Sequence, residues 1–131
     1  MATYAKATKR TGLRPPGGDA RTSPDDIHEL LELTNDDDPK VRRLATKNLC
    51  PCHVRADVPQ VWDRLFDMLD DPDPGVRRDA VHALGDGSPR ERAAEIASAL
   101  EPLYNDPDRT VRKHVRRVVT AYRRTGRVNV L

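Results

Sequence analysis

The stretch DPDPGVRRDAVHALGDGSP, residues 71–89, decides the fold because related stretches precede and follow it at a fixed distance. DDDPKVRRLATKNLCP begins 35 residues earlier, at residue 36, and DPDRTVRKHVRRVVTAY begins 35 residues later, at residue 106. The three copies share two aspartates, a valine and an arginine in phase, namely Asp36/Asp71/Asp106, Asp38/Asp73/Asp108, Val41/Val76/Val111 and Arg42/Arg77/Arg112. A period of this size is typical of stacked repeats, in which each unit packs only on its neighbours.

Each repeat is expected to form two helices separated by its Asp- and Pro-rich turn. Before the turn, Leu30, Leu65 and Leu100 fall in phase within apolar patterns of helical spacing. After the turn, Val41 and Ala45 begin an apolar stripe at spacing four. Start and stop signals place the repeats at about 23–51, 57–85 and 88–125. The predicted fold is therefore all-α, an α-solenoid of three antiparallel helix pairs.

Composition agrees with a thin helical stack. Of the 131 residues, 34% are charged and only 4% are aromatic, and a stack needs few large side chains because each layer buries only its two faces. The net charge of +2 is too small to indicate a partner. No apolar run approaches the roughly 20 residues of a membrane span, and residues 1–20 lack the apolar segment of a secretory signal. A cytoplasmic protein is the expectation.

The segments outside the repeat domain are expected to be irregular. Residues 1–22 are rich in Gly, Pro and basic side chains, and we expect a disordered basic arm there. Such an arm is either a solvated tail or a contact for nucleic acid or an acidic partner. Residues 126–131 are expected to form a short C-terminal tail.

The D-P-D-x-x-V-R core of each repeat, with the apolar positions around it, resembles the HEAT-repeat proteins over roughly residues 24–125. The CPCH and RTGRVNVL segments look like those of small bacterial HEAT-like proteins, a group that includes phycobilin lyase subunits. The resemblance implies a right-handed superhelical stack. It implies less about activity, because HEAT arrays serve as scaffolds, transport adaptors, lyase subunits and nucleic-acid enzymes.

The resemblance also implies an Asp–Arg ladder between layers. In HEAT proteins the turn aspartate binds the arginine six positions on, or its neighbour in the next repeat. The pairs expected here are Asp36 with Arg42, Asp71 with Arg77, and Asp106 with Arg112. Such pairs hold turn N–H groups as well as charges, so a structural role is the prediction.

A second set of basic residues lies one step further round the second helices. We call it the basic row, and it comprises Arg43, Lys47, Arg78, His82, Lys113, Arg116 and Arg117. It is either a solvated face, partly neutralised by Asp79, or a binding surface. The predicted function is a small scaffold or adaptor that binds a partner protein through this face. The alternative is binding of nucleic-acid phosphates by the basic arm and the basic row.

Chemistry-bearing motifs are sparse. Cys50, Cys52 and His53 are the only cluster of metal-type ligands, but a tetrahedral site usually needs a second ligand pair, so packing is favoured and no metal is predicted. Trp62 falls in phase with Ile27 and Ala97 and is expected in the core. No nucleophile elbow, phosphate-binding loop or H-E-x-x-H motif is present. We therefore predict neither enzyme activity nor a cofactor.

Overall fold

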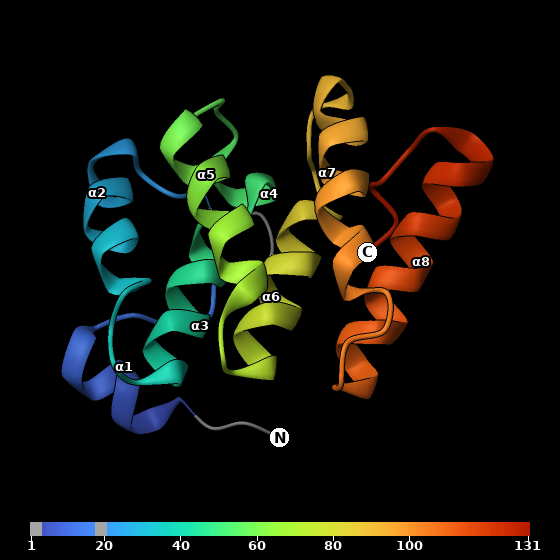
Figure 1. Cartoon of the computed structure of the whole chain (residues 1–131). Helices are drawn as coiled ribbons and strands as arrows, with labels where there is room; N and C mark the ends of the chain where they lie inside the picture. Colours follow the sequence, from blue (N-terminus) through green and yellow to red (C-terminus); the bar gives the residue numbers. More distant parts are fainter. Residues whose placement is uncertain (1–3, 18–20) are drawn as a thin grey trace.

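The computed structural model describes residues 4–17 and 21–131, which form helices and no strand. Three antiparallel helix pairs make up the stack, confirming the predicted α-solenoid (Figure 1). The pairs are α2 (Pro24–Leu33) with α3 (Pro39–Asn48), α5 (Pro59–Asp67) with α6 (Pro74–Leu84), and α7 (Ala93–Leu100) with α8 (Arg109–Thr125). Two shorter helices, α1 (Ala5–Thr11) and α4 (Pro51–Val54), were not expected from the sequence. The right-handed sense of the stack stays a prediction.

The second helices form the continuous centre of the stack. Helix α3 packs on α6, and α6 packs on α8. Val41, Val76 and Val111 have no exposed surface, as their recurrence predicts. Trp62 is also buried, which confirms its place in the core.

Each second helix begins at an aspartate for a local reason. Asp38, Asp73 and Asp108 are the residues preceding α3, α6 and α8, and each side chain accepts a hydrogen bond from a backbone N–H of the first turn. Such capping satisfies donors that a helix start leaves without partners. Pro39 and Pro74 occupy the first helical position, where the missing N–H is harmless.

The predicted Asp–Arg ladder connects neighbouring layers. Arg42 donates from Nε and Nη2 to the two carboxylate oxygens of Asp71, at 2.9 and 3.0 Å. Arg77 binds Asp106 in the same bidentate way, at 3.0 Å for both bonds. The remaining Nη1 of each arginine donates to carbonyls of its own turn, six and five residues back. The carboxylate partner is therefore in the next repeat, while the arginine's own repeat supplies only carbonyl oxygens.

The same aspartates also shape the turns. The Oδ1 atoms of Asp36, Asp71 and Asp106 each accept the backbone N–H two residues on, at 2.9 Å. The Asp106 side chain is only 3% exposed. Each ladder aspartate thus fixes its turn and binds the preceding layer, and such charge-assisted bidentate bonds are stronger than neutral ones.

The N-terminal segment differs from the disordered arm expected for residues 1–22. Helix α1 packs on α3, with Ala7 buried against Val41 and Leu44. Arg10 donates to Asp36 at 2.7 Å, which gives the first ladder aspartate an arginine that no preceding repeat supplies. The face of α3 that α1 covers is apolar at Val41 and Leu44. The free energy gained by burying this face exceeds the conformational entropy lost when the segment becomes ordered. The expectation for residues 1–3 and 18–20 lies outside the described residues.

The C-terminal tail, residues 126–131, packs back onto the stack. Val128 is buried, and the N–H of Leu131 donates to the carbonyl of Gly85 at 3.1 Å. The Asn129 side chain accepts from the N–H of Ser88 and donates to its carbonyl, at 2.9 and 2.7 Å. The Ser88 hydroxyl donates to the carbonyl of Leu84 at 2.7 Å. The tail therefore joins the second and third repeats.

We predict that Arg77→Ala lowers the free energy of unfolding by about 1–3 kcal/mol, because it leaves the Asp106 carboxylate buried without its cation. Arg112→Ala is the matched control. Among the described residues Arg112 has no carboxylate partner and donates only to the carbonyls of Asp106 and Pro107. Urea unfolding should show a clearly smaller loss for this variant. Equal losses would contradict an inter-layer role for the carboxylate.

Candidate functional site

The predicted basic row is interrupted at its first position. Arg43 was expected to be exposed, but its side chain is only 11% exposed. Its Nε donates to Asp79 at 2.8 Å, and its guanidinium lies over the ring of Tyr4, 5.5 Å from the centroid. Helix α6 accommodates this side chain because position 75 is glycine, where a Cβ would lie 2.9 Å from Arg43 atoms. The prediction of an exposed Arg43 is wrong, because Asp79 and Tyr4 hold it.

Asp79 neutralises much of the basic row. Its side chain is 5% exposed, and besides Arg43 it lies within 3.4 Å of Lys47 Nζ and 3.9 Å of Arg78 Nε. His82 lies 3.5 Å from the carboxylate of Asp86. A buried carboxylate requires such cationic partners, since desolvation otherwise disfavours its charge. Arg43 and Lys47 of α3 therefore stabilise the contact with α6, whereas Arg78 and His82 pair with carboxylates of their own repeat. These residues do not form a free cationic stripe.

The position of Asp79 carries a different residue in each repeat. It aligns with Leu44 in the first repeat and His114 in the third. Leu44 is covered by Ala7 of α1. His114 Nδ1 is buried and has no hydrogen-bond partner among the described residues. In the third repeat His114 therefore replaces the carboxylate of Asp79, to which Arg43 donates in the second repeat.

The environment of His114 disfavours its charged form. Burial lowers the pKa of His114, and the nearby positive charges of His82, Arg78, Lys113 and Arg117 lower it further. A neutral imidazole is therefore the form that the folded protein favours.

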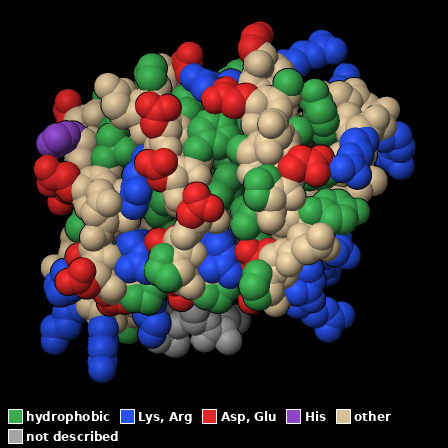
Figure 2. Space-filling model, in the orientation of Figure 1, with side chains coloured by type: hydrophobic (Ala, Val, Ile, Leu, Met, Phe, Trp, Pro, Cys, Tyr) green, Lys and Arg blue, Asp and Glu red, His purple; other side chains and the backbone are tan. Residues whose placement is uncertain are grey.

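The remaining row residues, Lys113, Arg116 and Arg117, are exposed on α8. Eight of the chain's 23 Lys and Arg residues, and none of its 21 Asp and Glu residues, lie in residues 109–131. That segment carries +8 and the rest of the chain carries −6. Figure 2 shows Lys and Arg side chains gathered along the edge of the molecule that α8 forms. The positive charge that the row was expected to spread over three helices is therefore concentrated on the last.

Not every cation of α8 is available. Arg116 donates to the Tyr104 carbonyl at 2.9 Å and lies over its ring, and Arg123 donates to Glu101 at 2.9 Å. Lys113, Arg117 and Arg124 form no ion pair within the described part of the chain; we call them the basic α8 face. Their spacing of four and seven residues places them on one side of the helix. Beside them runs a groove of about 400 Å³ lined by Arg116, Arg117, Thr120, Ala121, Arg124 and Val130.

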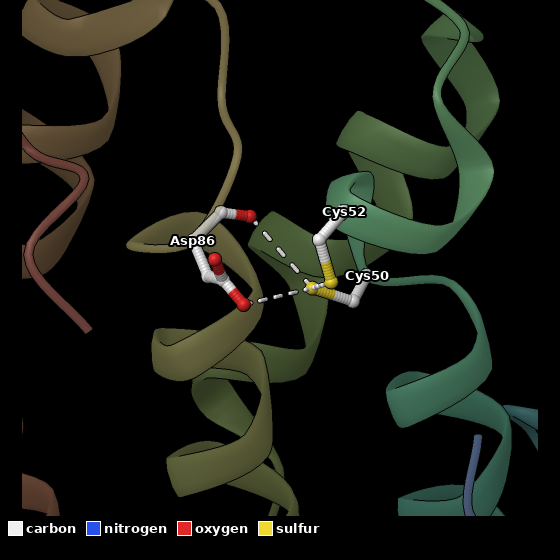
Figure 3. A group of neighbouring side chains, drawn as sticks. All are labelled: Cys50, Cys52 and Asp86. Atoms are coloured by element: carbon white, nitrogen blue, oxygen red, sulfur yellow. Dashed lines mark hydrogen bonds between the residues drawn. The ribbon is translucent and has the colours of Figure 1, made fainter. Parts of the chain in front are cut away.

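The two cysteines meet a carboxylate from the next repeat, as Figure 3 shows. Cys50 Sγ lies 2.9 Å from Cys52 Sγ and 3.8 Å from Asp86 Oδ2. We call Cys50, Cys52 and Asp86 the thiol–carboxylate cluster; its three ligand atoms all lie within 4.8 Å of one another. His53, named with the cysteines from the sequence, lines the same pocket of about 230 Å³ but is not part of the cluster. Asp86 takes its place because the α6 terminus approaches the cysteines.

Burial keeps the free thiols protonated. Desolvation raises the pKa of Cys50 strongly, and desolvation also raises the pKa of Cys52. A thiol with a raised pKa is a poor nucleophile at neutral pH, because the thiolate is the reactive form. This environment does not favour nucleophilic catalysis by either residue.

Comparison with protein-family models matches residues 27–120 to HEAT repeats. The chain belongs to the HEAT-repeat family. HEAT repeats commonly mediate protein–protein interaction and scaffolding. Comparisons with curated proteins and with solved structures give no match. None of the described helices is long and apolar enough to cross a bilayer.

Sequence reasoning missed the roles of Asp86 and His114 in this HEAT stack, and it named Asp79 only as a partial neutraliser of the basic row. A signal for Asp79 and His114 was present, because both replace an apolar residue, Leu44, when the repeats are aligned. Asp86 gave no such signal, since its counterparts are Pro51, the first residue of α4, and Ala121, a partly buried residue of α8. Its role appears only when the α6 terminus meets the cysteines.

We predict that His114→Leu raises the free energy of unfolding at neutral pH by about 1 kcal/mol, because it removes a buried polar atom without a partner. The variant should also be less sensitive to acid. In the parent, the folded-state pKa lies below the unfolded value of about 6.5, so the unfolded chain binds the proton first and stability falls as pH drops through that value.

Urea unfolding at several values of pH between about 7.5 and 5.5 measures this slope. His28→Gln, which removes an exposed histidine of α2, is the matched control. The assignment fails if His114→Leu and the parent show the same pH dependence.

Proposed function

We propose that this protein is a small HEAT-repeat scaffold that binds an acidic segment of a partner protein through the basic α8 face. The observation that carries the proposal is the charge of residues 109–131, which hold eight basic and no acidic side chains. Lys113, Arg117 and Arg124 remain without ion pairs among the described residues. Unpaired cations on one helix side attract an acidic partner and speed its association.

The pairing elsewhere in the molecule supports this choice of surface. Arg43 and Lys47 already have Asp79, and Arg10 already has Asp36. A ligand that recruited these cations would have to leave a carboxylate of the protein without its partner, which costs free energy. The basic α8 face requires no such exchange.

The groove beside this face favours a polypeptide as ligand. Arg117 and Arg124 line it together with the apolar side chains of Ala121 and Val130. Guanidinium groups bind carboxylates in bidentate geometry, and an apolar strip between them suits an apolar side chain of the same ligand. A segment that combines Glu or Asp with a residue such as Leu matches both features.

Nucleic acid is the second candidate for the same face. The lack of any acidic residue in 109–131 would also suit a phosphate backbone. The basic arm and the basic row, first expected to bind nucleic acid, are less suitable because Arg10 is paired with Asp36 and Arg43 with Asp79. The apolar side chains of Ala121 and Val130 in the groove give the acidic peptide the stronger support.

Fluorescence anisotropy with three labelled probes tests the proposal. The probes are a peptide with alternating Glu and Leu, the same peptide with Gln for Glu, and a random-sequence DNA duplex. We expect the Glu peptide to bind most tightly, and Arg117→Glu to weaken it at least tenfold by replacing an attraction with a repulsion. Arg90→Glu reverses one charge at an exposed position before α7 and should leave affinity within about twofold.

The outcomes separate the candidates. Preference for DNA, with affinity falling steeply as salt rises, would replace the proposal with nucleic-acid binding. Binding that Arg117→Glu and Arg90→Glu weaken equally would show a general charge effect. No binding of any probe would leave α8 as the polar end that keeps a repeat array soluble.

A further inference from the structure

We propose that Cys50, Cys52 and Asp86 bind a zinc ion that links the first repeat to the second. Cys50 lies between α3 and α4, Cys52 belongs to α4, and Asp86 follows α6 (Figure 3). The chain contains only two cysteines, and the fold brings both to one carboxylate. This proposal is independent of the proposed function, because the cluster lies between the first and second repeats and contains no residue of the basic α8 face.

The distances suit one shared ion after a small adjustment. Two sulfurs bound tetrahedrally to zinc at about 2.3 Å lie roughly 3.8 Å apart, whereas Cys50 Sγ and Cys52 Sγ are 2.9 Å apart. A movement of about 1 Å by the half-buried Cys52 thiol opens that space. Cys50 Sγ and Asp86 Oδ2 are already 3.8 Å apart, close to the separation that two ligands of one zinc adopt.

The loops that carry the ligands are already in contact. Gly87 has a φ of +85°, and a Cβ there would lie 3.1 Å from the backbone nitrogen of Cys52. Glycine at this position lets the end of α6 approach α4 closely. Little backbone movement is therefore needed to assemble the three ligands.

A fourth ligand position faces the pocket of about 230 Å³. His82 lines this pocket, and its Nε2 lies 3.5 Å from Asp86 Oδ2. The imidazole can reach the ion by a side-chain rotation, or it can hold the Asp86 carboxylate from outside, as partners of metal ligands commonly do. Either role makes His82 a secondary contributor to affinity.

The ligand chemistry selects zinc. Two thiolates with a carboxylate and an accessible imidazole match the borderline-soft Zn²⁺, which accepts Cys, His and Asp ligands in tetrahedral sites. Cu⁺ prefers soft sulfur ligands alone, and Mg²⁺ or Ca²⁺ prefer oxygen. Binding requires both thiols to lose their protons, so affinity should increase as pH rises.

The test begins with chelator-treated, reduced full-length protein, with both thiols confirmed free by mass spectrometry. Titration with Co²⁺ should produce a thiolate-to-metal charge-transfer band that saturates at one ion per chain, and zinc should displace the cobalt. Zinc should also raise the melting temperature, because an ion that binds only the folded state stabilises it.

Four variants locate the site. Cys50→Ser and Cys52→Ser should each weaken the charge-transfer band and lower zinc affinity at least tenfold, and Asp86→Asn should lower affinity without removing the band. Asp63→Asn changes an exposed carboxylate of α5 and should behave as the parent does. Should the buried Cys50 variant fail to fold, the half-buried Cys52 and Asp86 variants, checked by circular dichroism, carry the test.

Two results would overturn the proposal. One is the absence of both a charge-transfer band and a zinc-dependent shift in melting temperature in the reduced parent. The other is zinc affinity that survives in folded Cys52→Ser and Asp86→Asn. In either case the cluster has only a packing role at the junction.

Discussion

The stack depends on one interaction, the bidentate bond from an arginine of each layer to the turn aspartate of the next. Arg42 with Asp71 and Arg77 with Asp106 engage all three nitrogens of the guanidinium, because Nη1 donates to the carbonyls of its own turn. The bond therefore fixes two turns and the distance between them at once. First and second helices both contribute buried side chains to the core, but the arginine sets the phase of the second helices, since one position on each must reach one carboxylate.

A finite stack has two ends, and this protein treats them differently. At the first, α1 covers Leu44 and contributes Arg10, so the segment substitutes for a preceding second helix. At the last, Arg112 meets no carboxylate of the described chain and α8 presents cations to solvent. At the first end the apolar surface is buried under α1, and at the last end the exposed surface of α8 is made polar by its Lys and Arg side chains. The proposed binding surface therefore lies on α8 and not on the face that runs along all three second helices.

The sequence predicted what the repeat period determines. Helix pairs and buried valines follow from the phase of Val41, Val76 and Val111, because equal positions in a stack have equal surroundings. The ladder was implied by the resemblance to HEAT-repeat proteins. The period could not predict what breaks it. Asp79 draws Arg43 and Lys47 inward, and Asp86 meets the cysteines, through side chains that occur in one repeat only. The docking of α1 was also missed, because a short helix among Gly and Pro residues depends on a surface formed elsewhere in the chain.

These single-copy contacts limit how freely the repeats can be exchanged. Removing residues 71–105 would delete one full period and bring Arg42 to Asp106, so the ladder would close again. Arg43, however, would then face His114, and the cysteines would face Ala121. Arg43 would then have an imidazole in place of its carboxylate partner, and the thiols would lose their carboxylate. The ladder is repeated and would tolerate the deletion, whereas the carboxylates that pair with Arg43 and approach the cysteines occur in the middle repeat and would be lost with it.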